Sequence, residues 1–184
     1  MFFGKRKKKE NENTFIRNKD ALPIIDTEEK VFLRDFTPDQ EQVILYGLDR
    51  GYPIRVYGYT QLPASYMKLI VDSIYESPKG HAEVREIDIW KLVHTDLNYN
   101  QMKWCLQALT YGLSIVDHIP DLKQYDDHVL ELIAEGAVYG INLCNEVSPD
   151  MYIEVFTAKA NDKITQAMNK EKNKNILNKF IYGK

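Results

Sequence analysis

Three glycines, Gly51, Gly112 and Gly140, constrain the fold of this chain more than any other feature of its sequence. Each follows an apolar stripe with helical spacing and precedes apolar residues at alternate positions. A glycine in this position can adopt the left-handed conformation that ends a helix, while an apolar residue beyond it packs on the last turn. The sequence therefore predicts three helices that end at a glycine and continue into a short extended connector.

The expected starts of the helices carry matching signals. The segment TPDQ at 37–40 has an N-cap threonine, a proline at the first helical position and a glutamine where a capping box needs it. Further starts fall near residues 63, 98, 125 and 148, which gives an interval of about 26 residues. We predict an all-α domain of five or six helices, arranged as irregular repeats; the alternative is a helical bundle without repeats.

An insertion of roughly nine residues interrupts this interval near 77–97. It opens with turn residues, and we expect a strand or an irregular helix around Ile87, Ile89 and Trp90. The last helix is expected over residues 151–168.

Two segments follow the pattern Gln-x-x-x-Ile/Leu-x-x-x-Leu-x-x-Gly-Leu-x-Val/Ile most closely. They are QMKWCLQALTYGLSIVDHI at 101–119 and EQVILYGLDRGYPIRVYGY at 41–59. The pattern resembles the repeats of uncharacterised short-helical-repeat proteins carried by phages and mobile elements of low-GC Gram-positive bacteria. The resemblance covers about residues 37–150. It implies helical repeats and a phage or mobile-element origin, and it implies no enzyme activity.

Charge divides the chain into three parts. Residues 1–9 hold five cations and no acid, residues 159–184 have a net charge of +5, and residues 10–158 carry −13. We predict a basic, extended N-terminal arm (1–36), a helical-repeat body (37–158) and a final part (159–184) with the end of a helix and a flexible Lys/Asn-rich tail. An acidic surface can compete for a basic nucleic-acid-binding groove on another protein.

The sequence lacks the motifs of the common catalytic classes. It contains no phosphate-binding loop, dinucleotide-binding or nucleophile-elbow motif, and no run of about 18 apolar residues. Its first residues do not resemble a signal peptide, and Cys105 and Cys144 lie in apolar segments as expected of reduced core residues. We therefore predict a non-catalytic protein without a cofactor, in the cytoplasm of a bacterial host cell.

One segment, residues 116–128, gathers side chains that bind metals or exchange protons in other proteins. They are Asp117, His118, Asp121, Asp126, Asp127 and His128. Their spacing matches no metal-binding motif, and aspartate is common at helix starts because it caps the first turn. We interpret them as capping and connector residues and predict no metal site.

The basic N-terminus is one candidate for contact with a partner. Its residues are Phe2, Phe3, Lys5, Arg6, Lys7, Lys8 and Lys9. The cations can neutralise phosphates of a nucleic acid or another polyanion while the phenylalanines stack on bases. The alternatives are weak contact with an anionic membrane surface and a tail that contacts only solvent.

The tyrosine-rich connector at 52–59 is a second candidate. In an extended chain Ile54 and Val56 would point inward, and Pro53, Arg55 and Tyr57 outward. Tyrosine and arginine are enriched at interfaces. The predicted protein interface consists of Tyr52, Arg55, Tyr57 and Tyr59. The alternatives are tyrosines that only pack between helices and an arginine that pairs with an acid such as Asp49.

These features predict a non-catalytic interaction protein that binds and occludes, or bridges, a larger host protein or nucleoprotein, for example to inhibit a host defence system. The alternative is a nucleic-acid-binding protein that uses its basic termini.

Overall fold

The computed structural model describes residues 24–25, 30–31, 35–75 and 84–182 of the chain. These residues form six α-helices: α1 (Pro38–Asp49), α2 (Ala64–Tyr75), α3 (Glu86–Val93), α4 (Tyr99–Thr110), α5 (Asp127–Val138) and α6 (Ile153–Tyr182). Two strands of two residues each, β1 (Ile24–Ile25) and β2 (Lys30–Val31), pair antiparallel, with Ile24 opposite Val31. The predicted all-α class is confirmed.

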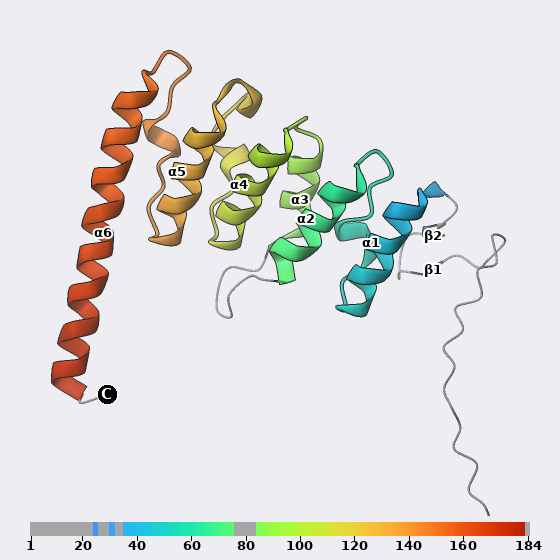
Figure 1. Cartoon of the computed structure of the whole chain (residues 1–184), viewed down its shortest axis with the longest axis horizontal. Coiled ribbons are helices and arrows are strands. Elements are labelled where there is room, and N and C mark those ends of the chain that lie inside the picture. Colours follow the sequence, from blue (N-terminus) through green and yellow to red (C-terminus); the bar gives the residue numbers. More distant parts are fainter. Residues whose placement is uncertain (1–23, 26–29, 32–34, 76–83, 183–184) are drawn as a thin grey trace, which may run out of the picture.

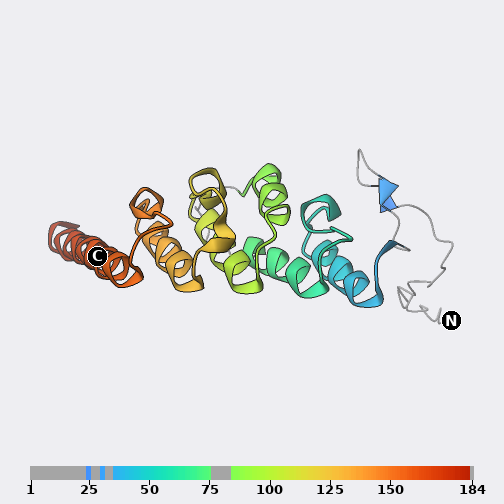
Figure 2. The ribbon, with the colours of Figure 1, turned by 90° about the horizontal axis from the view of Figure 1, so that it is seen from above.

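The helices form two layers. Helices α1, α2, α4, α5 and α6 lie side by side in one row, and each contacts the next (Figures 1 and 2). The connecting segments form the second layer, which carries the short 3₁₀-helices η2 (Ile54–Val56), η3 (Ile115–Asp117), η4 (Leu122–Gln124) and η5 (Cys144–Glu146). Because each connector returns along this second layer, the row helices all run in the same direction (Figure 1).

Helix α3 occupies the second layer, where it contacts η2 and α4. The insertion near 77–97 therefore lengthens the connector between α2 and α4 so that it carries a helix of its own. A strand or an irregular helix was expected there; the structure has a regular helix whose inner side buries Ile89, Leu92 and Val93.

Helices α1, α4 and α5 end in the same way. Gly51, Gly112 and Gly140 have φ angles of 80°, 83° and 71°. The amide of the residue after each glycine donates to a carbonyl in the last turn, at 3.0 Å (Tyr52 to Gly47), 3.0 Å (Leu113 to Ala108) and 2.9 Å (Ile141 to Gly136). This pattern is a Schellman motif, which only a residue with positive φ permits without strain. The predicted helix ends are confirmed.

The predicted extended connectors are wrong, because a 3₁₀-turn follows each of these three helix ends. Residues three apart lie on the same side of a 3₁₀-helix, so Ile54 and Tyr57 both turn inward. Both are fully buried, and the Tyr57 hydroxyl donates to the Ile44 carbonyl oxygen at 2.9 Å. The predicted outward orientation of Tyr57 is therefore wrong, and so is its assignment to the protein interface.

Helix α6 differs from the predicted end of the chain. It begins at Ile153, close to the expected 151, and continues to Tyr182, so residues 169–182 form a helix where a flexible tail was predicted. Phe156, Ala160 and Ile164 are buried on the side that contacts α5. The C-terminal half of α6 extends past the ends of the neighbouring helices (Figure 1).

Among the residues that the structure describes, no helix is both long enough and apolar enough to cross a membrane.

Candidate protein-interaction surfaces

The tyrosine-rich connector and helix α3 form one continuous surface, which we call the α3 surface. It consists of Arg55, Tyr59, Ile87, Trp90 and His94. The Arg55 guanidinium Nε donates to Glu86 Oε2 at 2.9 Å, so the connector is joined to the first turn of α3. The Tyr59 and His94 rings meet edge to face with their centroids 6.4 Å apart. The His94 ring lies against Trp90, with centroids 4.4 Å apart.

The exposed side of α3 supplies the large apolar side chains of this surface. Ile87 and Trp90 are each 49% exposed. Together with His94 they occupy positions i, i+3 and i+7, which share one side of a helix. Exposed tryptophan is unusual, because its large apolar area is better removed from water. The α3 surface therefore has the composition of a protein-binding site.

The sequence predicted only part of this surface. It predicted an interface at 52–59, and Arg55 and Tyr59 do belong to the α3 surface. Tyr52, like Tyr59, is half-buried and packs against the core. The predicted interface did not include Trp90 or His94, although their i, i+3, i+7 spacing with Ile87 is visible once a helix is assumed over 86–93. Arg55 pairs with Glu86 of α3, and no ion pair with the suggested Asp49 is found among the described residues.

Burial and the neighbouring Glu86 carboxylate raise the pKa of Tyr59 to about 12. The phenol therefore stays neutral at ordinary pH.

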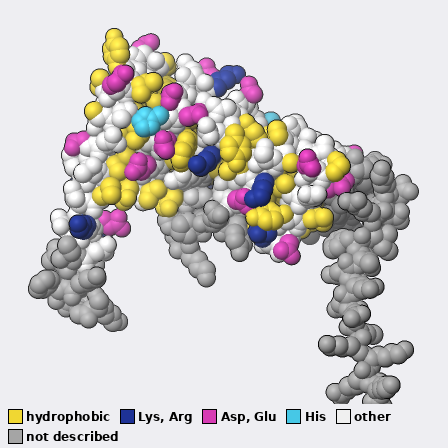
Figure 3. All heavy atoms as spheres, in the orientation of Figure 1, with side chains coloured by type: hydrophobic (Ala, Val, Ile, Leu, Met, Phe, Trp, Pro, Cys, Tyr) yellow, Lys and Arg dark blue, Asp and Glu magenta, His cyan; other side chains and the backbone are white. Residues whose placement is uncertain are grey.

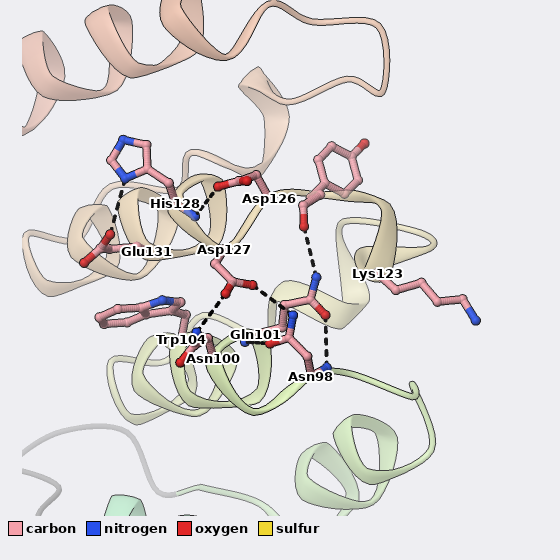
Figure 4. A pocket seen from close by; sticks show the side chains of 10 residues that line it. Asn98, Asn100, Gln101, Trp104, Lys123, Asp126, Asp127, His128 and Glu131 are labelled. Atoms are coloured by element: carbon pink, nitrogen blue, oxygen red, sulfur yellow. Dashed lines mark hydrogen bonds and ion pairs between the residues drawn. The ribbon is translucent and has the colours of Figure 1, made fainter.

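A second candidate is an open hollow between the N-terminal ends of α4 and α5 (Figure 4). It measures ≈ 710 Å³ and has Trp104 on one wall. The Asp127 carboxylate accepts hydrogen bonds from the side-chain amides of Asn98, at 3.0 Å, and Asn100, at 2.9 Å. His128 Nδ1 lies 3.3 Å from Glu131 Oε2. The polar groups here form hydrogen bonds with one another. We therefore interpret the hollow as a structural junction between α4 and α5.

The Asp and His residues of segment 116–128, which were considered as metal ligands, have different structural roles. The Asp126 carboxylate caps α5 by accepting from the His128 amide at 2.8 Å. Asp117 pairs with Lys91 at 2.5 Å, and this contact lowers the pKa of its carboxyl. Asp121 has a φ of 54° at the start of η4. In the described ranges no three His, Cys, Asp or Glu side chains are grouped as metal ligands would be.

The two cysteines lie in the core as free thiols. Burial raises the pKa of Cys105 to about 12 and that of Cys144 to about 11. Because the thiolate is the reactive form, neither side chain acts as a nucleophile at ordinary pH.

The candidate polyanion contacts at the N-terminus, Phe2, Phe3, Lys5, Arg6, Lys7, Lys8 and Lys9, lie outside the described residues.

Comparisons with protein-family models, curated protein sequences and solved structures find no match to this chain.

Proposed function

We propose that this chain is a non-catalytic interaction protein that binds a larger protein through the α3 surface. The half-exposed Trp90 side chain, with Ile87 beside it, is the main support for this proposal. Tryptophan, tyrosine and arginine are enriched among the residues that dominate binding energy at protein interfaces. Tyr59 and Arg55 extend the same surface from the neighbouring connector.

The charge of the body favours a partner with a basic surface. The helical body, residues 37–158, carries a net charge of −10, and acidic side chains are spread over the coloured part of the face seen in Figure 3. Complementary charge accelerates association and disfavours the wrong partners. We propose a host protein or nucleoprotein as the partner of a phage- or mobile-element-encoded protein. Occlusion of its nucleic-acid-binding surface, as by an inhibitor of host defence, is the proposed mode of action.

A double variant tests the α3 surface. Ile87→Ala with Trp90→Ala removes the two large exposed side chains, and Leu45→Ala, at a 43% exposed position on α1, is the matched control. The proteins are immobilised and exposed to host lysate, and captured proteins are quantified by mass spectrometry. We expect one partner to bind wild type and control equally and to bind the double variant at least about tenfold more weakly, because hot-spot truncation costs about 2 kcal/mol or more.

Equal capture of every protein by the double variant and the control contradicts the proposal. Circular dichroism of all three proteins checks that the double variant remains folded, which is expected because both side chains lie at the surface.

A further inference from the structure

The lysines of α6 fall into two groups. In the first half of α6, Lys159 and Lys163 pair with Glu146, and elsewhere in the described chain Lys68, Lys91 and Lys123 also pair with carboxylates. The Lys103 ammonium lies 4.2 Å from the centre of the Trp104 ring. By contrast, Lys170, Lys172 and Lys174 form no ion pair or ring contact with any described residue. Their charges are therefore available to a partner.

These three lysines lie on the part of α6 that no other element covers. Every residue from 168 to 175 is exposed, and this half of the helix extends past the row (Figure 1). Because the body is acidic, it repels a polyanion. The projection of α6 places the three cations away from that charge.

Polar residues are arranged around this helix in a particular order. At 3.6 residues per turn, Asn169 and Asn173 share one side. Lys172 flanks this side on one edge, and Lys170 with Lys174 flanks it on the other. The asparagine side lies nearly opposite the buried stripe of Phe156, Ala160 and Ile164, so it faces away from the body.

We propose that residues 168–175 of α6 bind B-form DNA by lying in its major groove, with Asn169 and Asn173 toward the base edges and the lysines toward the phosphates of both strands. A helix of 10–12 Å diameter fits the major groove of about 12 Å. Asparagine amides pair with adenine there, and flanking cations contact the backbone. This inference adds a nucleic-acid contact to the protein and does not depend on the α3 surface.

Other polyanions fit this arrangement less well. A helix that lies on an anionic membrane needs an apolar side opposite its cations. Residues 168–175 contain one apolar side chain, Met168, and the cations lie on two opposite edges. The major groove of duplex RNA is too deep and narrow for side chains to read.

Fluorescence anisotropy with a labelled DNA duplex of about two helical turns tests the proposal in the full chain. The test variant carries Lys170→Ala, Lys172→Ala and Lys174→Ala. The control carries Lys68→Ala, Lys103→Ala and Lys123→Ala, which change the net charge equally. We expect the test variant to bind about tenfold more weakly at low salt. The negative slope of log K against log salt should become shallower by about three, because each phosphate contact contributes about −0.9 to it. The control should bind as wild type does.

The sequence predicts that the basic N-terminal residues contact polyanions, so both sets are repeated with Lys5, Arg6, Lys7, Lys8 and Lys9 all changed to alanine. A loss caused by the α6 lysines in both backgrounds supports the proposal. Equal binding by the test variant and the control in both backgrounds overturns it. Binding of duplex RNA as tight as the binding of DNA also overturns the proposal. So does a protein that fails to bind DNA but binds phosphatidylserine vesicles through the same lysines.

Discussion

Gly140 ends α5 in a backbone conformation that few other residues adopt, with a φ of 71°. A Cβ atom added there meets nothing within 4 Å, so a substitution is opposed by backbone strain alone. We expect Gly140→Ala to lower the free energy of unfolding by about 1–2 kcal/mol, the cost of a left-handed alanine. Gly140→Asn should lower it less, because asparagine tolerates this region. Urea denaturation measures both values.

Gly136, one turn earlier, provides the comparison. Its Cβ position lies 2.8 Å from Leu143 Cδ1, so Gly136→Ala is opposed by packing and not by the backbone angle. If Gly140→Ala and Gly140→Asn prove equally destabilising, the left-handed conformation is not the reason for the glycine.

Gln40 shows how one side chain joins two elements. Its Oε1 accepts from the Thr37 amide at 2.8 Å, which completes the capping box of α1. Its Nε2 donates to the carbonyls of Leu62, at 2.6 Å, and Thr60, at 3.1 Å. Gln101 repeats the arrangement by donating to the Tyr125 carbonyl at 3.0 Å. In both cases a helix start is bonded to the end of the connector that follows the helix.

Gln40→Glu separates the two roles of this side chain. Glutamate keeps the cap acceptor but cannot donate to the connector, and it places a carboxylate against two carbonyls. We expect the free energy of unfolding to fall by about 1–3 kcal/mol, the usual cost of an unsatisfied buried polar group. The same change at the exposed Gln42 on α1 is the control, and chemical denaturation is the measurement. A similar loss from both variants would show that added charge alone is responsible.

The row of helices ends at α6, and among the α6 residues whose burial is described (153–175) the buried ones, Phe156, Ala160 and Ile164, lie in the first half. Removal of residues 168–184 is expected to change the free energy of unfolding by less than about 0.5 kcal/mol, as exposed positions usually do. Phe156→Ala should cost about 3–5 kcal/mol, because it empties a fully buried site between α5 and α6. Thermal and urea unfolding compare the two proteins. A large loss on truncation would mean that the projecting half packs against the body.

The sequence determined the parts of this fold that depend on neighbouring residues. A positive φ at Gly51, Gly112 and Gly140 and the capping box at 37–40 follow from local backbone chemistry, so the predicted helix ends and the first helix start agree with the structure. The all-α class follows from these signals. Part of the candidate site was also predicted from the sequence, because the residue types alone assigned Arg55 and Tyr59 to a candidate interface.

Tertiary structure decided what those signals leave open. Tyr57 turned inward because a 3₁₀-turn and the space above Gly47 gave its ring a buried position, which no local preference required. Trp90 lies beside Arg55 and Tyr59 in the α3 surface because α3 packs against η2, which is a contact between segments far apart in sequence. Which face of α6 is covered depends mainly on α5, and Glu146 of η5 adds ion pairs to Lys159 and Lys163. Local chemistry fixes where a helix begins and ends, whereas the exposure of its side chains is fixed by what packs against it.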